Sequence, residues 1–192
     1  MTLFGEWFEA AHQVGLPEPS AAALATVDEH GAPSVRMVLV RGVDERGFVF
    51  YTNLQSRKGV ELGGGRPGRH PAALCFYWPP LARQVRVEGE ALPVTAAEAD
   101  AYWASRPRAH QIAAWASPQS QTLAGGKDEL TRRFGEMDRR LPAENVPRPP
   151  YWSGFRIEPR TIEFWEGKPG RLHDRVLYTN EGGRWAKAVL AP

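Results

Sequence analysis

Residues 22–52 read AALATVDEHGAPSVRMVLVRGVDERGFVFYT, and this stretch decides the fold class. Apolar runs that contain β-branched and aromatic side chains occupy residues 22–27, 34–43 and 48–52. Two segments, Asp28–Gly31 and Asp44–Gly47, separate the runs, and both end in glycine. Glycine-ended turns between such runs are typical of a β-meander. We therefore predict three consecutive antiparallel strands.

The rest of the chain surrounds this meander with helices and further strands. Apolar residues recur at helical spacing from Leu3 to Ala11, and Thr95–Glu98 is a capping-box pattern that opens a helix. Further helices are predicted at residues 56–62, 107–115 and 130–141, and strands at residues 72–78, 83–92, 154–157, 161–165, 172–178 and 185–190. The pattern predicts a mainly β fold with flanking helices, whose antiparallel sheet closes into a barrel. No composition break divides residues 1–192, which we interpret as a single domain.

Composition and charge exclude several classes of protein. Hydrophobic residues make up 42% and charged residues 24%, while 19 glycines and 17 prolines favour turns and short strands over a helical bundle. The net charge of +2 is too small for a general nucleic-acid binder, so we expect no nucleic-acid partner. No apolar run reaches the roughly 18 residues of a membrane span, and the acidic N-terminus does not resemble a signal peptide. We therefore expect a cytoplasmic protein with no membrane partner.

The sequence carries no motif for metal or serine-based catalysis. Its single cysteine, Cys75, excludes an internal disulfide and lies in an apolar run, which favours a buried structural thiol over a nucleophile. The five histidines have no metal-ligand spacing, and no P-loop, dinucleotide fingerprint or serine-triad motif occurs. We therefore expect no bound metal.

Arginines on the second predicted strand give the first indication of a ligand site. Arg36 and Arg41 are five residues apart, so they project from opposite faces unless a bulge intervenes. An arginine on an apolar strand face needs an anion, a carboxylate or an exposed rim. Either an anion site or a solvated edge strand accounts for this pair.

Two further cationic clusters favour an anionic ligand. Arg57 and Lys58 fall in the first turn of a predicted helix, where free N–H groups attract anions and cations are unfavourable, so we favour a phosphate site there over two solvated charges. On a strand, Arg171, His173 and Arg175 share one face. Because such groups repel one another, we favour an anionic ligand lying across them over a chance cluster facing water.

Segments along nearly the whole chain resemble the pyridoxamine 5′-phosphate oxidase family. The matching segments, in order, are ATVDEHG (25–31), VFYTNL (49–54), SRK (56–58), RQV (83–85), SRPR (105–108), AWASPQS (114–120), WSGFR (152–156), IEFW (162–165), RLHDR (171–175) and LAP (190–192). The resemblance implies a split β-barrel homodimer that binds FMN between its subunits. It also implies oxidation of pyridoxine or pyridoxamine 5′-phosphate to pyridoxal 5′-phosphate, with O₂ reduced to hydrogen peroxide.

The resemblance assigns roles to individual residues. The residues implied to hold the FMN phosphate are Arg36, Arg57 and Lys58. Those implied to contact the rest of FMN are Met37, Val38, Tyr51, Thr52, Gln84, Gln119, Ser120, Trp165 and Arg175. The implied substrate-binding residues are Arg41, Tyr102, Arg106, His110, Arg171 and His173. The last two are the implied catalytic residues, with Arg171 over the substrate ring and His173 bonded to its polar substituents.

The chain departs from the family pattern where substrate is expected to bind. It has Arg41 in place of the usual Lys, His110 in place of Ser and Val189 in place of Arg, and it begins later than the family pattern, so we expect the family's longer N-terminal segment to be missing. Arginine keeps the charge of lysine but replaces a compact ammonium with a planar fork. These changes leave open a sister flavin oxidase of the phenazine-biosynthesis type, acting on another reduced ring.

A third interpretation, a flavin carrier or sensor without turnover, does not need Arg171 and His173. Because both residues are present, we favour an enzyme. Pyridoxamine 5′-phosphate oxidation is the expected activity.

Overall fold

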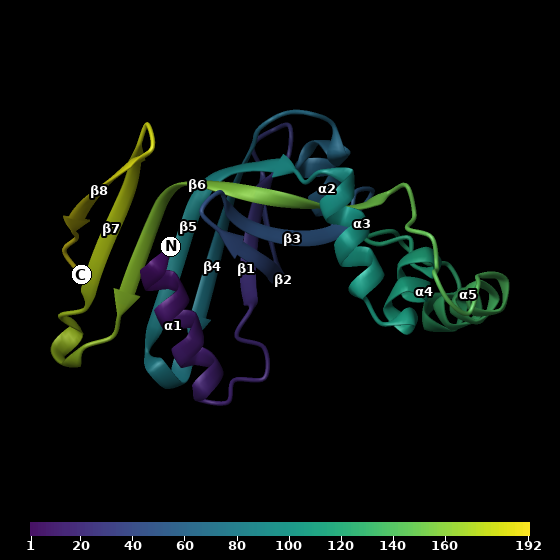
Figure 1. The fold of residues 1–192 in the computed structure, drawn as a ribbon, viewed down its shortest axis with the longest axis horizontal. Coiled ribbons are helices and arrows are strands. Elements are labelled where there is room, and N and C mark those ends of the chain that lie inside the picture. The colour runs from purple at the N-terminus through teal and green to yellow at the C-terminus, as the bar shows by residue number, and fades with distance from the viewer.

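A β-barrel and a helical lobe make up the computed structural model, which describes residues 1–192 (Figure 1). The strands are β1 (Ala21–Val27), β2 (Pro33–Asp44), β3 (Gly47–Asn53), β4 (His70–Trp78), β5 (Arg83–Pro93), β6 (Trp152–Glu166), β7 (Asp174–Glu181) and β8 (Arg184–Val189). The helices are α1 (Thr2–Gln13), α2 (Arg57–Glu61), α3 (Ala96–Ser105), α4 (Arg108–Ala116) and α5 (Gly126–Arg140). None of these helices is long and apolar enough to cross a membrane.

Six strands close into the barrel. The hydrogen-bonded order is β3-β2-β1-β4-β5-β6, and a further pairing of β3 with β6 closes the ring. The meander predicted from residues 22–52 is therefore confirmed as three consecutive antiparallel strands. The hairpin of β7 and β8 extends the sheet beyond β6, on the side away from the helical lobe (Figure 1).

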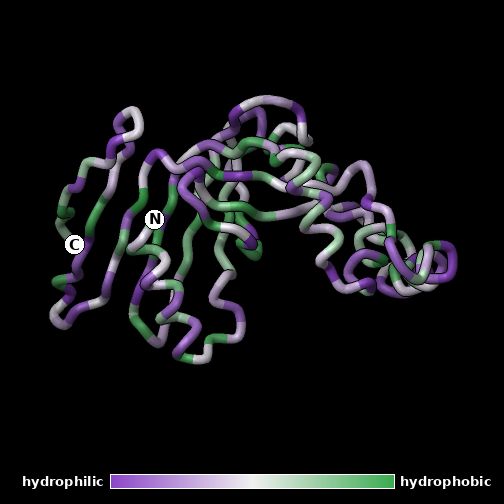
Figure 2. Tube along the Cα trace, in the orientation of Figure 1, coloured by the Kyte–Doolittle hydropathy of each residue, from purple (hydrophilic) through white to green (hydrophobic).

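Large aromatic side chains fill the barrel, because alternate residues of each strand point inward. Along β4, for example, Leu74, Phe76 and Trp78 are buried at every second position. Helix α1 adds Phe4, whose ring meets those of Phe48 and Phe76 edge-on, with centroids 5.0 and 5.1 Å apart. Figure 2 shows the corresponding hydrophobic segments along the barrel strands. The N-terminal helix predicted from its apolar spacing thus packs against the barrel core.

Helices α3, α4 and α5 form a lobe at the other end of the molecule (Figure 1). The predicted capping box begins α3, with Thr95 and Glu98 bonded reciprocally. Trp103 and Ile112 form a small core in this lobe with Val146 and Trp152. The indole of Trp103 donates to the Val146 carbonyl at 2.7 Å, which attaches the connection between α5 and β6 to the lobe.

Two predicted strands, at residues 154–157 and 161–165, are one continuous strand, β6. Pro159 lies between the two predicted segments, and proline removes a ladder hydrogen bond. In the structure, the pairing register with β5 shifts between Glu88 and Gly89, so Pro159 lies at an irregularity where the strand tolerates it. The strand therefore continues through the interruption.

The strand predicted at residues 172–178 begins later, at Asp174. Arg171 lies in a short 3₁₀ turn with a left-handed φ of 62°, and His173 lies in the loop that follows. The prediction that Arg171, His173 and Arg175 share one strand face is therefore wrong, since only Arg175 is on the strand. His173 Nδ1 accepts a hydrogen bond from the Lys168 backbone N–H at 3.1 Å, which closes the loop on itself instead of extending the ladder.

Candidate active site

A cavity of about 720 Å³ lies between strands β2 and β3 and helices α3 and α4. Ten of the residues singled out in the sequence line it: Met37, Val38, Arg41, Tyr51, Thr52, Lys58, Tyr102, Arg106, His110 and Gln119. They come from segments more than 80 positions apart in the chain. Strands β2 and β3 and the helical lobe thus bring together four predicted substrate residues, Arg41, Tyr102, Arg106 and His110. Half of the predicted FMN residues line the same cavity.

Stacked aromatic rings form one wall of this cavity. The rings of Tyr51 and Tyr102 are 4.0 Å apart and 13° from parallel, and Trp152 stacks on Tyr51 at 5.6 Å. The guanidinium of Arg106 lies over the Trp152 ring, 4.7 Å from its centroid. The wall is therefore flat and apolar, with one cation placed against it.

Arg106 has a nitrogen that the protein leaves without a hydrogen bond. Its Nη1 atom is buried and has no partner within the chain. Burial lowers the pKa of Arg106, and the nearby Tyr102 acts in the opposite direction. Buried polar groups are almost always paired, so this nitrogen beside the cavity is a position where a ligand or a water molecule would supply the acceptor.

A second cavity, of about 420 Å³, adjoins the first and shares Met37, Lys58 and Gln119 with it. The other residues that line it are Ser34, Val35, Arg36, Arg57 and Ser120. Three cations therefore surround a small space that also offers hydroxyl groups. Ser120 holds a left-handed φ of 70°, a strained backbone conformation that is common at ligand sites.

Lys58 is a buried cation without a carboxylate partner. Its side chain reaches only the hydroxyl groups of Thr52 and Ser56, at 3.3 and 3.5 Å. Burial lowers the pKa of Lys58, and the nearby positive charge of Arg36 lowers it further. A negative charge in the second cavity would offset both effects, as the nearby carboxylate of Glu61 does in part.

Arg36 is bonded within its own chain. Its two terminal nitrogens donate to the Leu24 carbonyl, to Thr26, to Ser34 and to the carboxylate of Glu61. Arg36 is half-buried and Arg41 is exposed, but the pairing register with β3 shifts between Val40 and Gly42, so the bulge named as the exception to simple alternation lies at Arg41. The carboxylate alternative named from the sequence thus accounts for part of the environment of Arg36.

Arg57 is held differently, through Nε alone. Its Nε donates to Glu61 at 2.9 Å, and its two terminal nitrogens have no partner in the chain. The expected free N–H groups at this helix start are used in part, because the Ser56 hydroxyl accepts from Gly59. A Cβ on Gly59 would lie 2.5 Å from the Asn53 and Leu54 carbonyls, so glycine allows α2 to approach the end of β3.

The remaining predicted site residues line neither cavity. Gln84, Trp165 and Arg175 lie on β5, β6 and β7 in one row, because Gln84 pairs with Trp165 and Trp165 with Arg175. His173 packs on Trp165 with ring centroids 4.7 Å apart, and Arg171 is in the same loop. Arg175 donates to the buried Glu163 carboxylate at 2.8 Å and to the Ala191 carbonyl at 2.8 Å.

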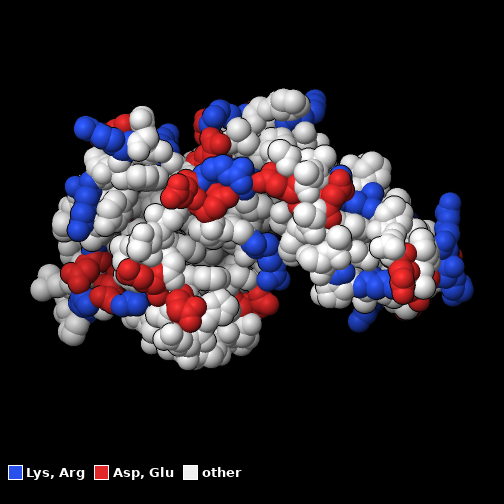
Figure 3. Space-filling view, in the orientation of Figure 1, with Lys and Arg blue, Asp and Glu red and all other residues white.

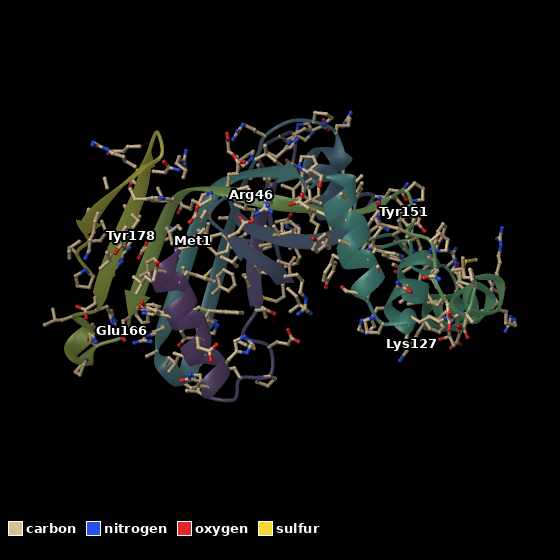
Figure 4. All side chains as sticks on the ribbon, in the orientation of Figure 1. Met1, Arg46, Lys127, Tyr151, Glu166 and Tyr178 are labelled. Atoms are coloured by element: carbon tan, nitrogen blue, oxygen red, sulfur yellow. The ribbon has the colours of Figure 1, made fainter.

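These five residues and the two cavities belong to opposite sides of the barrel. Figure 4 places Glu166, next to the loop of Arg171 and His173, near β7, whereas Tyr151 lies beside the helical lobe. The structure therefore divides the predicted site into two half-sites: the cavity half, made by β2, β3, α2, α3 and α4, and the C-terminal half, made by β5, β6, β7 and the loop between β6 and β7.

Sequence reasoning missed several residues that complete the cavities. The unpredicted lining residues are Ser34, Val35, Leu39, Asn53, Ser105, Pro107, Ala113, Ala114, Ser117 and Trp152. Glu61, which holds both arginines, was also missed. Its spacing of four residues from Arg57 was a usable signal, because i,i+4 pairs face each other on a helix.

Charged residues of both signs are interspersed over the visible face of the molecule (Figure 3). The concentration of cations around the second cavity is thus a local feature of the chain. The structure contains no group of three or more His, Cys, Asp or Glu side chains that could hold a metal ion.

Comparisons with known proteins agree with this geometry. Residues 8–166 match the family described as pyridoxamine 5′-phosphate oxidase. Residues 152–192, which contain β6, β7 and β8, match the pyridoxine 5′-phosphate oxidase C-terminal dimerisation region. All residues of the C-terminal half-site except Gln84 on β5 therefore lie in a region whose family description is dimerisation.

Curated relatives and solved structures extend the comparison over the whole chain. The pyridoxine/pyridoxamine 5′-phosphate oxidase of Rubrobacter xylanophilus is 51% identical over 98% of this chain and 85% of its own. That of Myxococcus xanthus is 52% identical over 98% of this chain and 89% of its own. The crystal structure of PhzG from Burkholderia lata 383, in complex with tetrahydrophenazine-1-carboxylic acid, superposes with a TM-score of 0.90 at 33% identity, covering 100% of this chain and 91% of that one. The chain therefore belongs to the pyridoxamine 5′-phosphate oxidase family.

Proposed function

We propose that this protein is an FMN-dependent oxidase that converts pyridoxine or pyridoxamine 5′-phosphate to pyridoxal 5′-phosphate. Pyridoxine 5′-phosphate gives up two electrons and two protons at its alcohol carbon, and O₂ takes them up as H₂O₂. The amine substrate additionally consumes one water and releases ammonia. The unpaired, buried Nη1 of Arg106 in the larger cavity is the observation that carries this proposal.

A substrate phosphate satisfies what the larger cavity lacks. Arg106 needs an acceptor, and the charges of Arg41 and the hydroxyl of Tyr102 line the same space. Phosphate offers several strong acceptor oxygens, which form charge-assisted bonds with guanidinium groups. The stacked wall of Tyr51, Tyr102 and Trp152 provides an apolar surface beside a planar ring.

FMN fits the second cavity and the part of the first that adjoins it. Arg57 and Lys58 would bind its phosphate, and Arg36, which also lines the second cavity, would add positive charge. Thr52 and Gln119 would contact the rest of the FMN molecule. The buried Lys58 without a carboxylate supports a phosphate here. When bound, FMN accepts two electrons from the substrate and passes them to O₂.

We infer that a second copy of the chain completes each site. The C-terminal half-site faces away from its own cavities, so Arg171 and His173 of one subunit would act at the cavity half of the other. The outer side of β2 supports an association, because Val35 and Met37 are 69% and 63% exposed on a strand face that continues through small alanines of β1. Exposed apolar strand faces of this kind are commonly covered by a partner.

The loop geometry suggests what His173 does. Because Nδ1 accepts a hydrogen bond from Lys168, the neutral ring carries its proton on Nε2. His173 would therefore donate to a polar substituent of the substrate ring. Arg171, in the same loop, would lie over that ring and fix its orientation, since holding reactants in place removes several kcal/mol of barrier.

Anaerobic mixing of FMN-loaded protein with pyridoxamine 5′-phosphate tests the activity. We expect the flavin absorbance to bleach, and hydrogen peroxide to appear when O₂ is admitted. Heat release of the bound cofactor should give FMN when it is compared with flavin standards. FAD, a deazaflavin or no binding of added FMN would contradict the cofactor assignment.

A phenazine-type oxidase is the second candidate, because PhzG superposes at a TM-score of 0.90. His110 and Arg41 both line the larger cavity, where they would suit a carboxylate on a larger ring system. The same anaerobic experiment with tetrahydrophenazine-1-carboxylic acid separates the candidates. Bleaching by that compound and none by pyridoxamine 5′-phosphate would favour the second.

A further inference from the structure

Glu61 is the one carboxylate bonded to the cations of the second cavity. Its side chain is only 5% exposed, and it lies behind the cavity without lining it. One oxygen accepts from Arg57 Nε at 2.9 Å and the other from Arg36 Nη2 at 3.1 Å. The hydroxyl groups of Thr26 and Ser34 also donate to it. Both arginines are thus held by the same buried group.

We propose that Glu61 is a positioning residue for phosphate recognition, which holds Arg57 through Nε and leaves both of its terminal nitrogens free for the phosphate. This inference rests on the proposed FMN function. A bidentate guanidinium–phosphate pair requires two parallel N–H groups in one plane. The Arg57 side chain is otherwise exposed and would move freely. Because the bond from Nε to Glu61 already restricts its rotamers, phosphate binding costs less side-chain entropy.

The charge of the site agrees with this role. Three cations and one carboxylate leave a formal net charge of +2 around the second cavity. A phosphomonoester carries about −1.5 to −2 at pH 7. Hydrogen bonds from Thr26, Ser34 and Arg57 outweigh burial and lower the pKa of Glu61 to about 2, so the carboxylate stays ionised throughout the neutral range.

The variant Glu61→Gln distinguishes the positioning of Arg57 from the electrostatic effect of the Glu61 charge on FMN binding. Glutamine keeps the shape but removes the negative charge, so electrostatics alone predicts tighter FMN binding. Positioning predicts weaker binding, because glutamine offers one acceptor oxygen and its NH₂ group opposes a guanidinium donor. We expect the Kd of FMN, measured by quenching of flavin fluorescence, to rise about five- to tenfold in the apoprotein.

Riboflavin, which lacks the phosphate, supplies a second measurement. The Kd of riboflavin should change less than about twofold. The ratio of the riboflavin Kd to the FMN Kd should therefore fall in Glu61→Gln. The matched control is Glu136→Gln, which removes an exposed i,i+4 partner of Arg132 on α5 and should leave both values unchanged. In an Arg57→Ala background, Glu61→Gln should lose most of its effect, since the two residues act on one contact.

The outcomes separate the two proposals. Unchanged or tighter FMN binding by Glu61→Gln overturns the positioning role, whereas a wild type that binds FMN no better than riboflavin overturns the phosphate site itself. If Glu61→Gln does not fold, Glu61→Asp keeps the charge and withdraws it by one methylene. That variant should also weaken FMN binding and spare riboflavin, and wild-type FMN affinity in it would contradict the proposal.

Discussion

The two half-sites differ in how their cations are satisfied. In the cavity half, Lys58 has no carboxylate partner and Arg106 retains an unpaired buried nitrogen. In the C-terminal half, Arg175 is bonded to Glu163 and to the Ala191 carbonyl, and His173 is bonded to the Lys168 backbone. The cavity half therefore has cationic groups without an anionic partner. In the C-terminal half, the side chains of Arg175 and His173 already have partners within the chain. We infer that ligands bind in the first and are oriented by the second.

Subunit complementation is the strongest test of whether the two half-sites of one active site come from different subunits. Arg106→Ala alters the cavity half and Arg171→Ala the C-terminal half, and each variant alone should lose most of its oxidase activity. If the halves come from different subunits, a mixed dimer has one intact site and one doubly altered site. Co-refolding equal amounts should therefore restore about a quarter of wild-type activity, measured as peroxide release.

The control for complementation uses two changes in the same half. Arg106→Ala mixed with Arg41→Ala leaves no intact cavity in any dimer that contains both, so each mixed site keeps one defect. No recovery by the first pair would show that one chain builds its own complete site, and an equal gain of activity in both pairs would show that the gain does not come from complementation.

Arg106→Ala should raise the KM for pyridoxamine 5′-phosphate about ten- to a hundredfold. The reason is the loss of a charge-assisted hydrogen bond, worth roughly 1.5–3 kcal/mol, in a buried place. FMN affinity should change little. Steady-state kinetics checks this, with Arg132→Ala on the exposed face of α5 as the matched control. An unchanged KM would place the substrate phosphate elsewhere.

Arg36→Ala should weaken FMN binding about tenfold or somewhat more. Its charge lies beside the second cavity, and its loss also frees Glu61, which then repels the phosphate. Fluorescence titration of the apoprotein measures the effect. The same Kd in variant and wild type would mean that Arg36 only stabilises the barrel.

Arg41→Lys combined with His110→Ser should raise the rate of pyridoxamine 5′-phosphate oxidation a few-fold. Both residues line the larger cavity, and both depart from the family pattern, so wild type should oxidise this substrate slowly. The comparison of kcat/KM between wild type and double variant is the measurement. A lower value in the double variant would indicate that the two residues serve this chain's own substrate.

The smallest expected effect concerns Glu98, which anchors the lobe to the barrel through Arg156 at 3.0 Å. Hydrogen bonds from Thr95, with those from Arg156, lower the pKa of Glu98 from 4.5 to about 2. A carboxyl with a lowered pKa stabilises the fold above its unfolded value, and this contribution is lost as the pH falls through the folded value. Glu98→Gln should therefore be less stable than wild type at pH 7, by urea unfolding, and the difference should shrink between pH 4.5 and pH 2. A difference that stays constant over this range would exclude ionisation of Glu98 as its cause.

Local patterns were sufficient to predict most of the fold. The meander at residues 22–52, the capping box at Thr95 and the N-terminal helix depend on turn chemistry and on apolar spacing, which neighbouring residues determine. The errors occurred where contacts outside the strand pattern decide the outcome. Strand β5 carries β6 past Pro159, and the Lys168 backbone draws His173 out of the β7 ladder.

The sequence by itself determined which residue types this protein offers to a ligand: the cations of β2 and α2, the aromatic residues of the lobe, and the pair Arg171 and His173. Only the tertiary structure decided how they are used. Barrel closure joins β3 to β6 and brings the lobe onto the edge of β2, so Arg106 becomes buried with a nitrogen unpaired. It also places Glu61 between Arg36 and Arg57, and it separates Arg171 from the cavities. The physical reason is that burial and pairing of a charge depend on contacts between strands far apart in the chain, which no local pattern records.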